Sequence, residues 1–282
     1  MGLRINTNVA SLNAQRNLLG TKLAMDKTLE KLASGQRINR AGDDAAGLAI
    51  SENLKAQVRG LGQAERNAQD GVSLVQIAEG ALSEVSNILI RLRELGVQAA
   101  SDTIGSTERK FLNVEFEQLV SEIDRIANST EFNRVPLLNG TGAVFDIQIG
   151  TRNDPISDRL TFDASSADVN IAALGLNLAS IADKISAQNS LSSIDQAIIS
   201  VSGIRADFGA LQNRLQSTIN NIAVGIENLS AANSRIRDAD IAKETAELTK
   251  NNILVTAGTS VLAQANNSTK MALGLINSTG MS

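Results

Sequence analysis

Large apolar residues recur every seven positions along two long stretches of the chain. The first series consists of Leu54, Leu61, Ala68, Val75, Leu82 and Leu89, with Ala78, Val85 and Leu92 in the companion position. The second consists of Ile194, Val201, Phe208, Leu215, Ile222 and Leu229, with Ile204 and Leu211 as companions. Sustained heptads predict long helices that pack against other helices. A shorter helix is predicted around Phe116, with Thr107 as its N-cap.

One region between the heptad stretches has strand character instead. Apolar and polar residues alternate from Val144 to Ile149, and a turn-rich stretch leads from there to LTFD at 160–163. Alternation at period two followed by a turn predicts a β-hairpin over 143–163.

The two terminal segments carry weaker apolar stripes. These are Ile5, Leu12 and Leu19 near the start, and Leu248, Val255, Leu262 and Ile276 near the end. Ordering about 40 residues costs roughly 1–2 kcal/mol each, whereas a Leu or Ile returns about 1.5–3 kcal/mol only when fully buried. We therefore predict that the terminal helices pair with each other and with neighbouring copies. The predicted fold is all-α and elongated: long antiparallel helices in a coiled-coil-like bundle, a small hairpin region, and terminal helices paired as an inner coiled coil.

Composition removes several classes of function. Only 2% of residues are aromatic, which suits narrow helix seams built from Ala, Val, Ile and Leu. The chain has no Cys and no His, which excludes disulfides, a thiol nucleophile and the commonest general base. No basic cluster indicates a nucleic-acid partner, no apolar run reaches the roughly 18 residues of a membrane span, and the first residues lack a signal-peptide pattern. We expect no cofactor and no membrane insertion, and leave export by a route other than Sec open.

The stretch RINRAGDDAAGLAIS at 37–51 places two carboxylates between glycines. Such a pair can hold a metal, act in acid/base chemistry or begin a helix. Asp44 is well placed to accept backbone N–H bonds at a helix start, and Gly42 and Gly47 would let the chain turn and pack closely. We predict capping and no metal or catalytic role.

Several stretches resemble bacterial flagellin. They are INTNVASLNAQRNL (5–18), LEKLASGQRINRAGDDAAGLAISENLKAQVRGL (29–61), NAQDGVSLVQIAEGALSEV (67–85), SEIDRIANSTEFNRVPLLNG (121–140) and SRIRDADIAKETAELTKNNILVTAGTSVLAQAN (234–266). The resemblance implies an inner-tube helix and spoke over 1–44, an outer helical layer over 45–238 with its hairpin at about 137–165, and an inner-tube helix over 239–282. The chain is similar to a minimal flagellin that lacks the large outer domains.

The resemblance also implies a function. The chain would be the structural subunit that polymerises with itself into the flagellar filament for swimming motility. It would be exported unfolded through the flagellar type III secretion channel to an extracellular position. Its partners would be an export chaperone, the filament cap and the hook-junction proteins. The spoke residues implied to meet neighbouring subunits are Arg37, Asn39, Arg40, Asp43, Asp44 and Gly47.

A second implied patch concerns host innate-immune receptors. The resemblance maps Leu89, Arg91 and Glu115 onto receptor-facing positions. Ile90 stands where the family usually has Gln, so the residues favour a solvated or inter-subunit helix face over receptor activation.

Three alternatives stay open at this point. A hook-filament junction protein shares the terminal motifs, although GDDAAGLAIS and SVLAQAN favour the filament subunit. A soluble coiled-coil adaptor could use the heptads, but seldom leaves apolar stripes on both ends. An enzyme is disfavoured, because the predicted fold offers no pocket.

Overall fold

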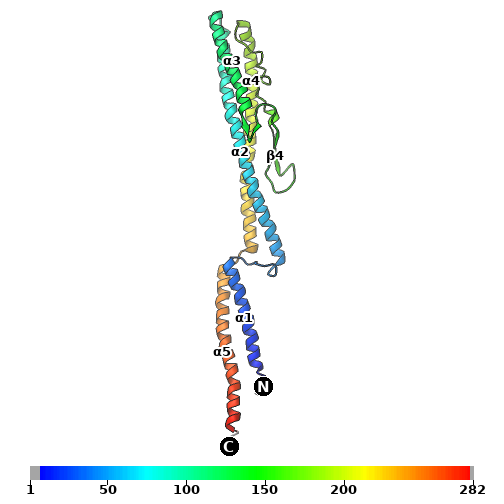
Figure 1. Cartoon of the computed structure of the whole chain (residues 1–282), viewed down its shortest axis with the longest axis vertical. Coiled ribbons are helices and arrows are strands. Elements are labelled where there is room, and N and C mark those ends of the chain that lie inside the picture. The colour runs from blue at the N-terminus through cyan, green and yellow to red at the C-terminus, as the bar shows by residue number, and fades with distance from the viewer. Residues whose placement is uncertain (1–6, 280–282) are drawn as a thin grey trace. The chain divides into compact units, whose positions relative to one another are not determined.

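The computed structural model describes residues 7–279 (Figure 1). The elements are α1 (Val9–Ser34), α2 (Ala45–Ala99), α3 (Ser106–Ser129), β1 (Glu131–Phe132), β2 (Val135–Pro136), β3 (Val144–Gln148), β4 (Arg159–Asp163), the short 3₁₀ helix η1 (Ala164–Ser166), α4 (Lys184–Arg237) and α5 (Ile241–Thr279). The fold class is therefore the predicted one: long helices, a pair of terminal helices and a small hairpin.

The chain divides into two compact units. Unit 1 comprises residues 1–56 and 229–282, and unit 2 comprises residues 57–228. The division falls inside α2 and α4, so each long helix contributes to both units. The domain limits at 44/45 and 238/239 stay a prediction.

Unit 1 is organised around the antiparallel pair of α1 and α5 (Figure 1). The side chain of Ser11 bonds to Asn266 near one end of the pair, and Lys31 bonds to Glu244 near the other. Buried and half-buried positions on α1 alternate at intervals of three and four: Ser11, Ala14, Leu18, Thr21, Met25, Thr28 and Leu32. The matching series on α5 is Glu244, Leu248, Asn251, Val255, Gly258, Leu262 and Ala265. We call the contact between these two series the seam.

The seam covers only part of the predicted apolar stripes. Leu248, Val255 and Leu262 are half-buried on the side that faces α1. Leu12 and Leu19 are 51% and 61% exposed, so the predicted stripe of α1 is not covered by α5. The reason is that small and polar side chains next to that stripe let the two helices approach closely and supply hydrogen bonds across the seam. Ile5 and the side chain of Ile276 lie outside the described part of the chain.

Unit 2 has a continuous apolar core between α2, α3 and α4. The central parts of both predicted heptad series are confirmed there, since Ala68, Val75, Leu82 and Leu89 on α2 and Ile194, Val201, Phe208 and Leu215 on α4 are at most 1% exposed. The companion Leu211 is 7% exposed, and Ile204 and the outer members Leu54, Leu61 and Leu229 are half-buried. Phe116 and Ile123 add the core face of α3 and are fully buried. Ion pairs at the rim, such as Arg205 with Glu79 and Arg93 with Asp195, show that α2 and α4 run antiparallel.

The start of α3 differs from the prediction. Gly105 is the N-cap, because its carbonyl accepts the first helical bond from the Arg109 N–H at 3.1 Å. Thr107 lies inside the first turn and caps nothing. The Arg109 guanidinium bonds to the carbonyls of Ala99 and Ser101, which fixes the turn that precedes the helix.

The predicted hairpin is confirmed as an antiparallel β3–β4 pair with Phe145 opposite Phe162. It lies on the helices through close contacts. A Cβ on Gly71 of α2 would be 2.7 Å from Ile147 Cδ1, and Phe162 packs on Phe208 of α4 with ring centroids 4.9 Å apart. The absence of a side chain at Gly71 therefore lets Ile147 of the hairpin pack directly against α2. The two-residue β1–β2 ladder was not predicted.

Adjacent residues on α2 give a direct test of the core. Leu89 is fully buried and Ile90 is 50% exposed. We expect Leu89→Ala to lower the free energy of unfolding by about 2–5 kcal/mol, since it leaves a cavity. We expect Ile90→Ala to change it by less than about 1 kcal/mol. Urea unfolding of the unassembled chain, followed by circular dichroism, measures both, and equal effects would contradict this assignment of the core.

Candidate functional site

Two chain segments cross in unit 1 where α1 ends and α5 begins. Gly35 ends α1 in the left-handed region with φ +69°, which glycine adopts without strain. Its carbonyl accepts from the Ala239 N–H at 2.9 Å, and the Arg37 N–H donates to the Arg237 carbonyl at 2.6 Å. We call residues 35–44 and 236–240 the joint. Backbone bonds in both directions hold its two segments together.

Arg237 is the central side chain of the joint. Its side chain is 15% exposed and forms an ion pair with Glu52 on α2. It also donates to Gln36 Oε1 at 3.0 Å and to Ser51 Oγ at 3.2 Å. Sequence reasoning missed this residue. Its position in the last turn of a helix, where a cation is favoured, was the available signal.

Asp43 stabilises the turn in which it lies. Its carboxylate accepts from the backbone N–H groups of Arg40 at 3.0 Å and Asn39 at 3.2 Å. The bonds from Arg40 first and Asn39 second hold the pKa of Asp43 below its usual value. The side chains of Arg40 and Asn39 in turn bond to Glu30 on α1, at 2.8 and 3.1 Å. This carboxylate therefore organises the loop.

Asp44 is the N-cap of α2, as predicted. Its Oδ1 accepts from the Gly47 N–H at 2.8 Å, and its carbonyl accepts from the Leu48 N–H at 2.9 Å. A Cβ on Gly47 would clash with Asp44 Oδ2 and lie 2.8 Å from Ile38 Cδ1, so a side chain there would displace the capping carboxylate or the buried Ile38. The expected need for glycine at 42 is wrong, because that position has open space and its φ is not left-handed.

The six predicted spoke residues thus lie together in and beside the joint. Arg37 donates both Nε and Nη2 to the Ile236 carbonyl. Arg37, Asn39, Arg40 and Asp43 are exposed although each is bonded within the chain. The arrangement is an internally hydrogen-bonded loop with a polar outer surface.

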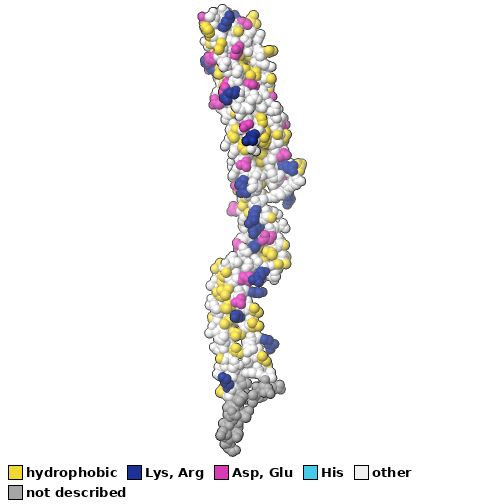
Figure 2. Space-filling view, viewed as in Figure 1, with side chains coloured by type: hydrophobic (Ala, Val, Ile, Leu, Met, Phe, Trp, Pro, Cys, Tyr) yellow, Lys and Arg dark blue, Asp and Glu magenta, His cyan; other side chains and the backbone are white. Residues whose placement is uncertain are grey.

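Apolar side chains lie at the surface along both helices of the pair (Figure 2). On α1 they are Val9, Leu12, Leu19, Leu23 and Leu29, and on α5 they are Ile241, Ile253, Leu254, Val261 and Met271. Each is between 44% and 66% exposed. We call these ten residues the outer apolar faces. Exposed apolar area on this scale marks an interaction surface.

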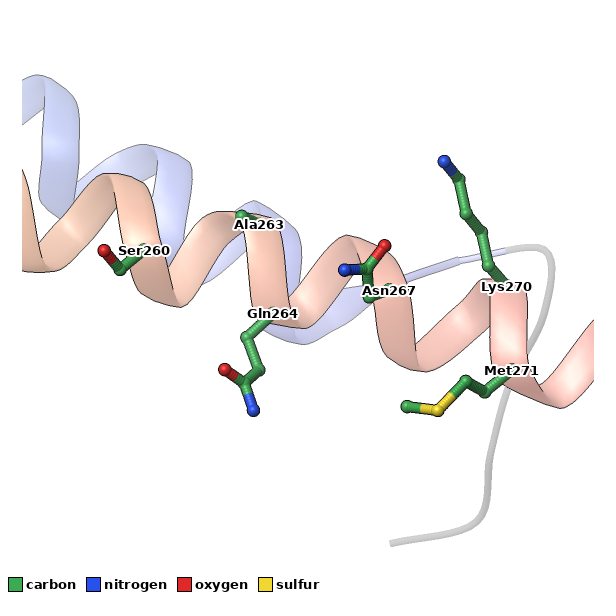
Figure 3. Close-up of a pocket in the computed structure, with 6 residues that line it drawn as sticks. All are labelled: Ser260, Ala263, Gln264, Asn267, Lys270 and Met271. Atoms are coloured by element: carbon green, nitrogen blue, oxygen red, sulfur yellow. The ribbon is translucent and has the colours of Figure 1, made fainter.

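A shallow groove of about 720 Å³ lies on α5 (Figure 3). Its described lining consists of Ser260, Ala263, Gln264, Asn267, Lys270 and Met271. All six side chains come from one helix, and Lys270 is the one charged group among them. Such a surface lacks the converging polar groups of a catalytic or ligand site.

The predicted receptor patch is not assembled as expected. Leu89 is fully buried, so the prediction that it faces a receptor is wrong. Its place in the core heptad turns it toward α3 and α4. Arg91 and Glu115 are exposed and bond to each other at 2.8 and 3.0 Å, and the bonds from Glu115 and Glu94 raise the pKa of Arg91.

Two searches of the described residues bear on other classes of function. Within residues 7–279, no three acidic, His or Cys side chains come together as metal ligands. Nor does any helix in that range have the length and apolarity needed to cross a bilayer.

These features define a helical structural protein with uncovered apolar faces. Comparison with known proteins identifies the family. The pattern of the bacterial flagellin N-terminal helical region matches residues 5–143, and that of the C-terminal helical region matches residues 191–276. The chain is 47% identical to the flagellin of Halalkalibacterium halodurans over 273 residues, covering 96% of this chain and 99% of that protein. It is 45% identical to the flagellin of Bacillus subtilis, covering 97% and 100%.

Other relatives extend the comparison. A flagellar filament 33 kDa core protein of Treponema phagedenis is 44% identical over 96% of this chain and 99% of its own length. The crystal structure of Bacillus cereus flagellin is 35% identical with a TM-score of 0.51, covering 60% of this chain and 94% of that one. The chain belongs to the bacterial flagellin family. It is a structural subunit of the flagellar filament.

The cap on α2 can be tested with a matched pair of variants. We expect Asp44→Ala to destabilise the first turn of α2 by about 1 kcal/mol, because the Gly47 N–H loses its acceptor. Asp44→Asn keeps an equivalent acceptor and should behave as wild type. Hydrogen exchange of the Gly47 amide in the unassembled chain reports the difference. Unchanged exchange in Asp44→Ala would show that this bond does not hold the helix start.

The lowered pKa of Asp43 predicts a dependence on pH. Its ionised form is favoured in the folded state, so its contribution is complete above the unfolded pKa of about 3.9 and is lost as the pH falls through the lower folded value. We expect the amide resonances of Arg40 and Asn39 to shift on acidification with a midpoint below about 3.9. Asp43→Asn should abolish that step. A midpoint at or above the ordinary value would contradict the two backbone bonds.

Proposed function

We propose that this flagellin polymerises with identical copies through the outer apolar faces of α1 and α5. The observation that supports this is the pairing itself. α5 covers one side of α1 and leaves the side with Leu12 and Leu19 at the surface. A second helical pair with the same repeat fits that surface, because seven-residue spacing on both partners lets side chains interlock.

The energetics favour a polymer over a simple dimer. Covering ten side chains that are now about half exposed is worth roughly 1 kcal/mol each. The cost of association is about 4–15 kcal/mol. A contact with one neighbour therefore comes close to balance. Several neighbours per subunit, as in a helical tube, give a stable assembly.

The joint has a complementary role in this proposal. Arg37, Asn39, Arg40 and Asp43 present polar groups at the surface, and Asp44 and Gly47 fix the start of α2 behind them. We propose that neighbouring subunits touch this surface. Its internal bonds support this role, because a contact made by a preorganised loop loses little conformational freedom on binding.

The remaining partners follow from the family. We propose export through the flagellar secretion channel with a chaperone, assembly under a filament cap, attachment through hook-junction proteins, and an extracellular position. A seam with polar positions such as Asn251 and Thr28 supports export, since such a pair separates more easily than an apolar core. The fold also supports a role without catalysis. The adaptor and junction alternatives are not favoured by the relatives.

Assembly through the outer faces predicts the behaviour of a double variant. We expect Leu12→Gln/Leu19→Gln to fold as a monomer but to raise the critical concentration for polymerisation at least tenfold, which corresponds to a loss of about 1.4 kcal/mol. Sedimentation and electron microscopy after seeding measure this. Ile156→Gln is the control, because Ile156 is 91% exposed and lies outside α1 and α5. Wild-type filament growth by the double variant would contradict the proposed interface.

A further inference from the structure

Asn139 and Gly140 form the single Asn-Gly pair of the sequence. They lie in unit 2, between β2 and β3. An Asn side chain followed by glycine can react with the backbone, because the glycine nitrogen is unhindered by a Cβ and can attack the side-chain amide carbon. Whether a fold promotes or prevents this reaction depends on how it holds the two residues.

The fold places two donors on the oxygen of the Asn139 amide. Oδ1 accepts from the Thr141 N–H at 3.1 Å and from the Thr141 hydroxyl at 2.7 Å. Attack on the amide carbon would move negative charge onto this oxygen. Two donors fixed on it stabilise that charge in the same way as an oxyanion hole.

The attacking group is also prepared. Gly140 has φ +71°, and among the described residues its N–H has no acceptor. On the side of its α-carbon where a Cβ would stand, the residue is packed against a carboxylate: Asp168 Cγ is 2.7 Å from that Cβ position, which a side chain could not share. Asp168 is held there by the Asn170 N–H, which donates to Oδ1 at 2.9 Å. The site therefore combines a backbone nitrogen that is free of hydrogen bonds to the described residues with an activated amide.

We propose that Asn139 is a site of self-modification promoted by the fold. The Gly140 nitrogen forms a bond to Asn139 Cγ as its proton passes to solvent water. The bond from Cγ to Nδ2 then breaks, and Nδ2 takes up a proton and leaves as ammonia. The product is a five-membered succinimide. Water opens it at either carbonyl to give aspartate or isoaspartate, so the net change is addition of one water and loss of one ammonia.

The modification has a structural consequence within unit 2. The Val169 N–H donates to the Leu138 carbonyl at 2.9 Å, and Asn170 Nδ2 donates to the Asn139 carbonyl at 2.7 Å. An isoaspartyl residue at position 139 adds a methylene group to the backbone and displaces the carbonyl of that residue. The contact between 138–140 and 168–170 would loosen. Since none of these residues belongs to the joint or to the outer apolar faces, the inference is independent of the proposed interface.

Mass spectrometry of the unassembled full-length chain tests the inference. Trypsin releases residues 135–152, in which Asn139 is the sole Asn. We expect the succinimide and then the acid forms to accumulate at Asn139 faster in the folded chain than in the same chain unfolded in urea. Thr141→Val should slow the reaction about tenfold, less than the 10²–10³ that a donor contributes in an enclosed enzyme site. Thr141→Ser keeps the hydroxyl donor and should restore the rate.

Two results would overturn the inference. One is that Asn139 reacts more slowly in the folded chain than in urea, which would show that the fold protects it. The other is that Thr141→Val, which loses the hydroxyl and keeps the backbone N–H, reacts as fast as wild type, which would show that the hydroxyl donor does not promote the reaction. Thr141 is exposed, so neither substitution is expected to alter folding, and circular dichroism of each variant checks this.

Discussion

The pairing of α1 with α5 is the interaction on which the rest of unit 1 depends. Each helix carries apolar or small residues on more than one side, but the chain supplies one partner for each. The seam takes the side on which Ala14, Gly258 and Ala265 allow a close approach, and polar residues within it are satisfied by Ser11–Asn266 and Lys31–Glu244. A second set of large apolar side chains, which includes Leu12 and Leu19, is left outside. What the subunit buries by itself is therefore one of two apolar faces.

Unit 2 follows the opposite rule. Its heptad positions are filled by Leu, Val, Ile and Phe, and the core of α2, α3 and α4 is closed to solvent along its length. Polar groups stand at its rim as ion pairs. Such a core folds without help from another molecule. One chain thus joins a self-sufficient bundle to a helical pair with uncovered faces, and the backbone bonds of the joint fix where that pair begins.

Much of the fold could be predicted from the sequence, because the spacing of apolar residues indicates the buried face wherever an element has a single apolar face. The heptads of α2 and α4, the hairpin and the Asp44 cap belong to this group. The face of α1 that meets α5 could not be predicted, for a physical reason: Leu12 and Leu19 stand one position from Ser11 and Leu18, and neighbouring positions on a helix point about 100° apart. Both series have the same period, so spacing cannot tell which one meets α5. Leu89 was expected both in the core and at a receptor surface, and only the core position is compatible with its place in the heptad.

The β1–β2 turn was not predicted because Asn133 and Arg134 adopt positive φ although neither is a glycine. The contacts around Asn139 join residues about thirty positions apart, which no local pattern contains.

The strict seven-residue interval of the seam also sets a handedness. An undistorted helix turns through about 700° in seven residues, about 20° short of two full turns, so two helices that keep the same side toward each other wind around each other to the left. With a pitch of about 150 Å, the 26 residues of α1, roughly 39 Å long, pass through about a quarter of a revolution. The uncovered side of the helix rotates by the same angle from one end to the other. A partner that contacts the uncovered side of α1 along its whole length must follow the same left-handed supercoil. This favours another copy of this chain over an unrelated straight helix.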